Sequence, residues 1–417
     1  MIISHTKLNT LEEITRYLTS ELPKINEKRT PTDNVSIFHR GVKLLSELGN
    51  PQNSHKTIHV AGTSGKGTVC YMIDAILRAH SKKTVLMVGP HVYDIRERIQ
   101  INGQFAPEKK YVKASKLVIN HARQANSSGI FYSYLEILIA ISFLLSASSE
   151  VDYKIIETIV GGRHDLTNTI SGAQKYCVLT QIGLDHTEIL GTTFQEIATE
   201  KAEIINNGSN VTALRQKESV NQAFTKIADK YGSKISWVES TGNYEIDDFL
   251  IALNACKNVA ERDGWLFDEQ LAQKAISELY IPGRFEKRSI NDSMVILDGA
   301  HNPQKIAALC GRIKRDNIGP ITVILAMGQH KDYQSSLKSL LGICNNLIIC
   351  EYFLNHPEVP KRPLSAEILY KAAKNLNIEN VEIIKQPSLA LRQALRHDLP
   401  ILVTGSFYLL GEIDKSF

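Results

Sequence analysis

The chain has 417 residues, more than a single hydrophobic core usually serves, so two or three domains are expected. Hydrophobic residues make up 43% of the chain and charged residues 22%, which is typical of a soluble globular protein that can bury a large core. A formal net charge of +4 over this length is too small to indicate a nucleic-acid-binding protein.

The cysteine and apolar patterns favour a cytoplasmic protein that is not inserted in a membrane. Residues 1–19 hold no continuous apolar run, so neither a signal peptide nor an anchor is predicted there. The longest apolar run, Ile137–Leu145, is too short to cross a bilayer and is expected to be a buried helix. The cysteines are scattered without metal-type pairing and are expected to be reduced: Cys70, Cys177, Cys256, Cys310, Cys344 and Cys350.

Two helices are predicted before the first strand, because apolar residues recur at helical spacing over residues 10–20 and 35–48. The first strand is the apolar run Thr57–Val60, and an amphipathic helix is predicted over Val69–Ala79. Between them lies a glycine-rich turn with one lysine, formed by Gly62, Thr63, Ser64, Gly65, Lys66, Gly67 and Thr68.

This turn has the layout of a phosphate-binding loop. Glycines let backbone amides point at phosphate, the following helix adds positive potential, Lys66 neutralises charge, and a hydroxyl can reach Mg²⁺. A nucleoside triphosphate is the expected ligand. The general pattern is modified, because Val60 replaces the first glycine and Gly67 separates Lys66 from Thr68. An ordinary turn rich in small residues is the alternative.

Strand and helix signals then alternate along the chain. A surface hairpin is predicted over residues 95–103, which alternate in polarity and close on an Asn-Gly turn. Such repeated units predict a mostly parallel sheet covered on both faces, with ligands at the carboxyl ends of its strands. Further strands are predicted at 84–88, 153–157, 176–180, 211–214 and 235–238, and helices at 133–146 and 252–261.

A second, smaller α/β unit is predicted beyond the polar stretch Arg288–Asp292. We therefore expect one domain over residues 1–289 and another over residues 290–417. The alternation restarts in the second with strands predicted at 294–297, 321–326, 347–350, 381–384 and 401–404.

A set of short motifs follows the chain at Gly62–Thr68, Pro90-His91 with Glu97-Arg98, Glu157, Gly161–Arg163, Asp165–Asn168, Asp185–Gly191, Glu200–Ala202, Pro282–Glu286, Asp298–Pro303 and Thr404–Leu409. In the order and spacing of these motifs, the chain resembles the folylpolyglutamate synthase and dihydrofolate synthase family of the Mur ligase superfamily. The resemblance implies a P-loop domain of the Mur ligase central type, followed by a Rossmann-like C-terminal glutamate ligase domain.

The activity implied is an ATP-dependent amide ligation. Phosphoryl transfer from ATP would activate a folate or dihydropteroate carboxylate as an acyl phosphate, and the amine of L-glutamate would displace phosphate. The implied cofactor is Mg²⁺, with a monovalent cation as a further candidate, and the expected state is a monomer. Two alternatives stay open: a Mur-type ligase with another acceptor, such as a peptidoglycan precursor, and a nucleotide-binding homologue that has lost catalysis.

The resemblance also implies roles for single residues. The ATP contacts are Gly62, Thr63, Ser64, Gly65, Lys66, Gly67, Thr68, Asn254 (adenine), Arg284 (phosphates) and Asp298 (ribose). The metal ligands are Thr68, Glu157, His186 and Lys201, the last as a carbamate. The catalytic residues are Lys66, Lys201, His186 and His301. The substrate contacts are Pro90, His91, Arg98, Gly162, Arg163, Asp165 and Lys331.

The residues themselves leave other interpretations open. Glu157 ends an apolar strand, where a carboxylate is costly to bury without a cation, yet it could be a solvated strand end. His186 could cap a helix, and Asp298 could be the N-cap of a helix beginning near Pro303. Four other candidates could be ordinary solvated residues: Lys201, Asn254, Arg284 and Lys331.

The chain departs from the family pattern in three places. Gly89 stands where a serine usually contributes to a metal site, so that site is expected to be weaker or completed by another group. Leu250 and Ile251 replace the His-Gln pair usual before the adenine-contacting asparagine, taken here as Asn254. Glu203 replaces a glycine two positions after the carbamylated lysine.

Overall fold

The structure is a computed structural model that describes residues 7–22, 31–170, 174–206, 208–352 and 363–415. The described residues form two compact units. The first takes in the chain up to Gly89 and from Ile95 to Leu279, and the second takes in Pro90–Asp94 and the chain from Tyr280 onward. The division into functional domains at residues 289 and 290 remains a prediction.

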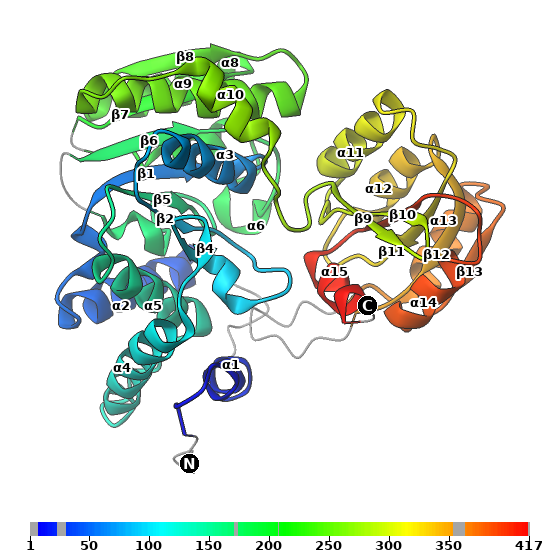
Figure 1. Cartoon of the computed structure of the whole chain (residues 1–417), viewed down its shortest axis with the longest axis horizontal. Coiled ribbons are helices and arrows are strands. Elements are labelled where there is room, and N and C mark those ends of the chain that lie inside the picture. The colour runs from blue at the N-terminus through cyan, green and yellow to red at the C-terminus, as the bar shows by residue number, and fades with distance from the viewer. Residues whose placement is uncertain (1–6, 23–30, 171–173, 207, 353–362, 416–417) are drawn as a thin grey trace. The chain divides into compact units, whose positions relative to one another are not determined.

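The first unit is built on one sheet with the strand order β4-β3-β2-β5-β1-β6-β7-β8 (Figure 1). The six strands from β2 to β8 in this order run parallel, and β3 and β4 form an antiparallel edge. The strands are β1 (Lys56–Ala61), β2 (Thr84–Met87), β3 (Ile99–Ile101), β4 (Gln104–Phe105), β5 (Tyr153–Glu157), β6 (Lys175–Leu179), β7 (Asn210–Arg215) and β8 (Ile235–Glu239).

Helices cover this sheet, which explains why its central strands are almost continuously buried. The helices α3, α9 and α10 pack together, as do α7 with α8 and α4 with α1 and α5. The helices are α1 (Leu11–Ser20), α2 (Pro31–Glu47), α3 (Lys66–Ala79), α4 (Glu108–Asn126), α5 (Tyr134–Ala147), α6 (Thr187–Leu190), α7 (Phe194–Ala202), α8 (Glu218–Lys230), α9 (Tyr244–Asp263) and α10 (Glu269–Ser277).

The second unit has its own sheet, with the strand order β13-β12-β11-β14-β10-β9 (Figure 1). Only β9 among these strands is antiparallel to its neighbour. The strands are β9 (Glu286–Ile290), β10 (Ser293–Leu297), β11 (Ile321–Leu325), β12 (Cys344–Ile349), β13 (Val381–Ile383) and β14 (Ile401–Thr404). The helices are α11 (Pro303–Arg315), α12 (Tyr333–Leu340), α13 (Ala366–Asn375), α14 (Pro387–Ala394) and α15 (Phe407–Asp414).

The predicted fold class, a mostly parallel sheet domain followed by a smaller α/β domain, is confirmed. The predicted hairpin is shorter than expected. Residues Ile95–Arg98 form a 3₁₀ turn, and the hairpin is made by β3 and β4 around Asn102 and Gly103, whose φ angles are 52° and 74°. Its strand β3 pairs with β2, so the hairpin extends the main sheet.

The helix predicted from residue 252 begins earlier, at Tyr244. Asn243 caps it by accepting a hydrogen bond from the amide of Glu245 at 3.0 Å. In the second unit, the polar stretch Arg288–Asp292 forms the end of β9 and the turn into β10.

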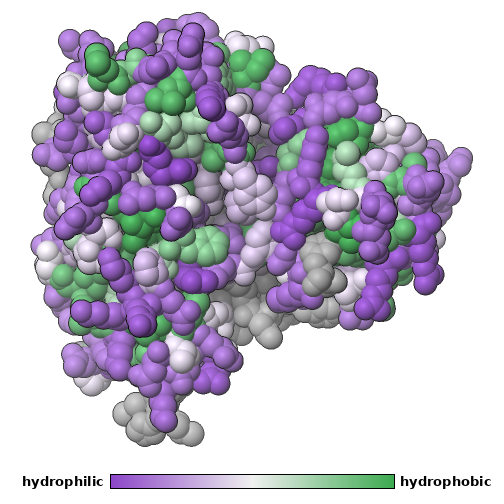
Figure 2. All heavy atoms as spheres, viewed as in Figure 1, coloured by the Kyte–Doolittle hydropathy of each residue, from purple (hydrophilic) through white to green (hydrophobic). Residues whose placement is uncertain are grey.

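Apolar side chains are mostly interior. On the face that Figure 2 shows, green apolar residues are scattered among purple polar ones. In the part of the chain that the structure describes, no helix combines the length and apolar character needed to cross a membrane.

Candidate active site

The glycine-rich turn joins the end of β1 to the start of α3. Gly65 precedes the helix with a φ of 82°, a conformation that residues with a side chain rarely adopt. The amides of Thr63 and Ser64 donate hydrogen bonds to the carbonyl of Gln181 at 2.8 and 3.2 Å. These hydrogen bonds therefore hold the first half of the turn against the segment that follows β6.

The first turn of α3 has the chemistry of an anion site. The amides of Lys66, Gly67 and Thr68 lack a carbonyl partner within the helix, as the first amides of any helix do. The Lys66 ammonium adds a full positive charge to the helix terminus. The hydroxyl oxygen of Ser64 is buried and has no hydrogen-bond partner among the described residues. Phosphate oxygens could accept hydrogen bonds from all of these donors.

Glu157 is the last residue of β5 and lies in register with Val60 on the neighbouring strand β1. Its side chain is only 8% exposed. One carboxylate oxygen is 3.9 Å from the ammonium of Lys66, and the other accepts a hydrogen bond from the amide of Gly89 at 3.1 Å. The carboxylate keeps lone pairs that these contacts do not use, and carboxylate oxygens suit Mg²⁺.

Lys201 lies in the last turn of α7 and is buried. Its ammonium makes no ion pair or hydrogen bond with the residues that the structure describes. Burial, followed by the nearby charge of Lys66, lowers the pKa of Lys201 to about 7, against the opposing effect of Asp185 and Asp165. Near neutral pH, much of this amine is therefore uncharged and nucleophilic.

His186 follows directly after Asp185 and has a left-handed backbone, with a φ of 52°. Its amide donates to a carboxylate oxygen of Asp185 at 3.1 Å. The imidazole Nδ1 lies 3.7 Å from an oxygen of Glu188, and this neighbour lowers the pKa of the Glu188 carboxyl. His186 occupies the N-cap position of α6, but its side chain makes no capping hydrogen bond there.

The loop after β5 is organised by Asp165. One of its carboxylate oxygens accepts the amides of Ile159 and Val160 at 2.7 and 2.6 Å, and the other accepts the amide and hydroxyl of Thr167 at 2.9 and 2.5 Å. Four hydrogen bonds on one carboxylate make Asp165 the anchor of this loop.

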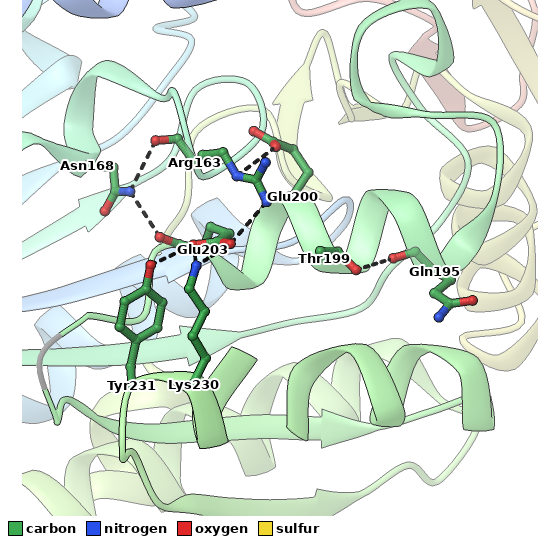
Figure 3. Close-up of polar contacts among 8 residues, drawn as sticks. All are labelled: Arg163, Asn168, Gln195, Thr199, Glu200, Glu203, Lys230 and Tyr231. Atoms are coloured by element: carbon green, nitrogen blue, oxygen red, sulfur yellow. Dashed lines mark hydrogen bonds and ion pairs between the residues drawn. The ribbon is translucent and has the colours of Figure 1, made fainter. Parts of the chain in front are cut away.

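Arg163 belongs to the same loop and lies against the end of α7 (Figure 3). Its amide donates to the carbonyl of Glu200 at 3.0 Å. Its guanidinium donates to Glu203 at 3.0 Å and lies 3.8 Å from the carboxylate of Glu200.

Arg98 is buried in the first unit, with its guanidinium 5.8 Å from the ring centre of Tyr134. A Cβ atom at Gly89 would lie 3.0 Å from a guanidinium nitrogen of Arg98. A side chain at position 89 would therefore lie next to the guanidinium of Arg98. The next residues, Pro90 and His91, belong to the segment that groups with the second unit.

Asn254, the expected adenine contact, lies on α9 and faces the strands β7 and β8. Its side-chain oxygen accepts hydrogen bonds from the hydroxyls of Thr212 and Ser236 at 3.1 and 3.0 Å, and from the amide of Asn258 at 2.9 Å. The alternative of a residue facing solvent is therefore not what the structure shows.

A different residue of α9 approaches the phosphate loop. Asp248 is buried, and a Cβ atom at Gly65 would collide with its carboxylate. The glycine therefore allows α9 and the loop to pack closely.

In the second unit, Asp298 follows β10 and is half-buried. Its two oxygens accept the amides of Phe285 and Ala300, both at 2.8 Å, and burial raises the pKa of its carboxyl. The N-cap of α11 is Asn302, which accepts the amide of Lys305 at 2.9 Å. The helix-cap interpretation of Asp298 is therefore wrong.

The other candidates of the second unit lie on loops. The guanidinium of Arg284 is 5.5 Å from the ring centre of Phe407. His301 is oriented by a 2.8 Å hydrogen-bond contact between its Nδ1 and the carbonyl of Gly299. Lys331 lies in the turn before α12, where its amide donates to the carbonyl of Gly328 at 3.1 Å.

Among the described residues, no three or more His, Cys, Asp or Glu side chains gather as a ready-made metal site. The donor set around the phosphate loop nevertheless fits Mg²⁺. Glu157 and Thr68 supply oxygen atoms, and this ion commonly takes its remaining ligands from nucleotide phosphates and water.

Two family models match the chain: the Mur ligase middle domain over residues 60–257 and the C-terminal domain of dihydrofolate synthetase over residues 282–415. The dihydrofolate synthetase of Saccharomyces cerevisiae is 28% identical over 414 residues, covering 90% of this chain and 96% of the relative. The folylpolyglutamate synthase of Lacticaseibacillus casei is 28% identical over 413 residues, covering 91% and 94%.

The comparison with solved structures agrees. The folylpolyglutamate synthase of Mycobacterium tuberculosis, complexed with ADP and AMPPCP, matches with a TM-score of 0.79 at 25% identity, covering 91% of this chain and 94% of that chain. The chain belongs to the folylpolyglutamate synthase and dihydrofolate synthase family of the Mur ligase superfamily. The predicted enzyme class, an ATP-dependent acid–amino-acid ligase, is confirmed.

Two acidic residues near the phosphate loop, Asp185 and Asp248, were not predicted from the sequence to have a role in the site. Asp185 is electrostatically coupled to Lys201, and Asp248 packs against Gly65. The position of Asp185 at the exit of a strand was a usable signal. Asp248 offered little, because an aspartate pair near the start of a helix is ordinary, and only the packing of α9 reveals its neighbour.

Gly162 is required where the loop meets α7. A Cβ atom there would lie 2.6 Å from the carbonyl oxygens of both Glu200 and Lys201. We expect Gly162→Ala to lower the free energy of unfolding by about 1–3 kcal/mol, because backbone must move to admit the methyl group. Ligase activity should fall as well, because the displaced backbone carries Lys201. Urea unfolding and kcat measurements test this.

Gly311→Ala is the matched control. Gly311 lies inside α11, and a Cβ atom there would meet only Arg315, at 3.6 Å. Alanine is the better helix former, so this variant should be as stable as the parent or more stable. Equal stability of Gly162→Ala and the parent would contradict the close packing.

Proposed function

We propose that the chain adds L-glutamate to the carboxylate of a folate or of dihydropteroate, with ATP converted to ADP and phosphate. The observation that carries the proposal is the cluster at the carboxyl ends of β1 and β5. There the phosphate loop, the Lys66–Glu157 pair and the buried, low-pKa Lys201 share one neighbourhood. Family membership supplies the substrate class.

In the proposed mechanism, the first-turn amides of α3 and the Lys66 ammonium bind the ATP phosphates and neutralise their charge. Thr68, Glu157 and His186 would hold Mg²⁺, which when bound polarises phosphate oxygens. The acceptor carboxylate attacks the γ-phosphorus, and the bond to the ADP oxygen breaks. The acyl phosphate formed is then attacked by the glutamate amine, which loses a proton as phosphate leaves.

Lys201 is proposed to act as a carbamate. Its neutral amine would add to CO₂ and release one proton, which converts the neutral amine into a carboxylate-bearing carbamate beside Lys66 and the proposed Mg²⁺ ligands. A buried amine with a pKa of about 7 and no ion pair among the described residues suits this reaction better than a solvated lysine does.

We propose roles for the remaining site residues from the family resemblance. Asn254 would contact adenine, Arg284 the ATP phosphates, Asp298 the ribose, and His301 the reacting groups. The folate side would involve Pro90, His91, Arg98, Gly162, Asp165 and Lys331, whereas Arg163, whose guanidinium is held by Glu203, would support the loop rather than touch the folate. We further propose a cytoplasmic monomer that uses a monovalent cation.

The relatives include both a dihydrofolate synthetase and a folylpolyglutamate synthase, so the acceptor needs an experiment. The protein is incubated with ATP, Mg²⁺ and glutamate, and with either dihydropteroate or tetrahydrofolate, and phosphate release is measured. Release that needs both acceptor and glutamate supports the proposal and identifies the acceptor. Release that needs neither contradicts it, and release only with a peptidoglycan precursor favours the other Mur-type function.

A further inference from the structure

Glu203, two residues after Lys201, is the hub of a polar cluster at the end of α7 (Figure 3). Its side chain is only 7% exposed. Its carboxylate accepts hydrogen bonds from the guanidinium of Arg163 at 3.0 Å, the ammonium of Lys230 at 3.0 and 3.3 Å, and the hydroxyl of Tyr231 at 2.9 Å.

The same residue also holds the loop through its backbone. The side-chain amide of Asn168 donates to the carbonyl of Glu203 at 3.0 Å, and the oxygen of Asn168 accepts the buried ammonium of Lys175 at 2.8 Å. Asn168 lies three residues after Asp165, the anchor of the loop. Glu203 therefore contacts the loop over residues 161–168 at two points. Its side chain accepts a hydrogen bond from Arg163, and its main-chain carbonyl accepts one from Asn168.

These contacts bear directly on the site. A Cβ atom at Gly162 would lie 2.6 Å from the carbonyl oxygen of Lys201, and the amide of Arg163 donates to the carbonyl of Glu200 at 3.0 Å. The loop therefore packs directly against the turn that carries Lys201. Asp165, on the same loop, is one of the charges that act on Lys201. A buried carboxylate that holds two cations from different elements is costly to disrupt and fixes their relative position.

We infer that Glu203 is a positioning residue: by holding Arg163 and the backbone of the loop against the end of α7, it sets the place of Lys201 relative to the phosphate loop. The inference rests on the proposed ligase function and extends it. Arg163 is thereby assigned to the scaffold of the site, since its guanidinium is held by Glu203.

The test compares Glu203→Gln with the parent enzyme. Glutamine keeps the shape but removes the charge that holds two cations. We expect kcat to fall roughly tenfold to a hundredfold, the effect of a small misplacement of reacting groups, while KM for ATP and for the acceptor changes less than about twofold. Hydrogen exchange of the amides over residues 159–168 should become faster, which is independent of activity.

Lys230→Met is the matched control, because it removes the other cation of the same carboxylate and leaves the Arg163 contact in place. Lys230 is half exposed and far less constrained. Its kcat should remain within about twofold of the parent, and exchange of the loop amides should be unchanged. Thr199→Val, which loses only the 2.8 Å bond to the carbonyl of Gln195 on α7, should behave in the same way.

Arg163→Met keeps the inference testable if the glutamine variant folds poorly, because the Arg163 side chain is 46% exposed. Its kcat should fall as in Glu203→Gln, and the double variant should be no worse than either single one, since both break one contact. Additive losses, a raised KM for the acceptor in Arg163→Met, or parental kcat and exchange in Glu203→Gln would overturn the inference. An inactive parent enzyme would instead refute the proposed function.

Discussion

Replacing Lys66 with alanine should abolish ligation while leaving the fold intact. The ammonium is the single full positive charge in the first turn of α3 and lies 3.9 Å from Glu157. Without it, charge on the transferring phosphoryl group is not compensated, and we expect kcat/KM to fall by at least about a hundredfold. Phosphate release and product formation measured with saturating acceptor and glutamate provide the test.

The fold of Lys66→Ala without nucleotide should stay intact, with an unfolding temperature close to that of the parent. Removing a cation from a helix N-terminus relieves an unfavourable interaction with the helix dipole, and this gain opposes the loss of the ion pair with the nearly buried Glu157. Lys109→Ala is the control, because Lys109 is an exposed lysine of α4 and should keep full activity. Ligase activity retained in Lys66→Ala would contradict the assignment of the phosphate loop.

Replacing Lys201 with alanine should cause a loss of similar size, about a hundredfold or more, because a ligand and its charge are both removed. Short carboxylates such as formate and acetate should restore part of the activity by entering the vacated space. In the parent enzyme, a ¹³C signal of a lysine carbamate should appear with ¹³C-labelled bicarbonate and be absent from the variant.

The pKa of Lys201 adds a pH dependence. At fixed dissolved CO₂, carbamate formation should increase as the pH rises through about 7, where the amine loses its proton. The folded-state pKa lies below the unfolded-state value of 10.5, so the unfolded chain binds more protons between about pH 7 and pH 10.5. The contribution of Lys201 to stability is therefore least favourable below pH 7 and improves as the pH rises through this window.

Lys226→Ala is the control for removing a lysine as such, because Lys226 is exposed on α8 and has no proposed role in the site. It should keep the parental activity at every pH. Full activity of Lys201→Ala, or equal rescue of an unrelated inactive variant such as Lys66→Ala by formate, would contradict the carbamate assignment.

The sequence predicted the elements that obey strong local rules. The strands at 153–157 and 401–404 coincide with β5 and β14, because short segments rich in β-branched and aromatic residues leave few alternatives. The start of α9 was missed because its first two turns carry acidic residues and lack a clear apolar stripe. Only the cap at Asn243 signals it.

The site was predictable in part, for a physical reason. Glu157, which ends β5, and Lys66, in the loop-to-helix junction after β1, can be placed from sequence because parallel strands end at one edge of the sheet. The partners of Asn254 and Glu203 depend on which helix faces which strand or loop. No periodicity in the sequence carries that information, so these contacts became visible only in the structure.

The central claim is that the acceptor carboxylate is activated by direct phosphorylation. The most direct test uses acceptor labelled with ¹⁸O in the reacting carboxylate, together with ATP, Mg²⁺ and glutamate, and analyses the released phosphate by mass spectrometry. One ¹⁸O atom from each carboxylate should appear in the released phosphate, because the oxygen that bridges carbon and phosphorus in the acyl phosphate leaves with the phosphate. Unlabelled phosphate alongside amide product would contradict the acyl phosphate and the mechanism built on it.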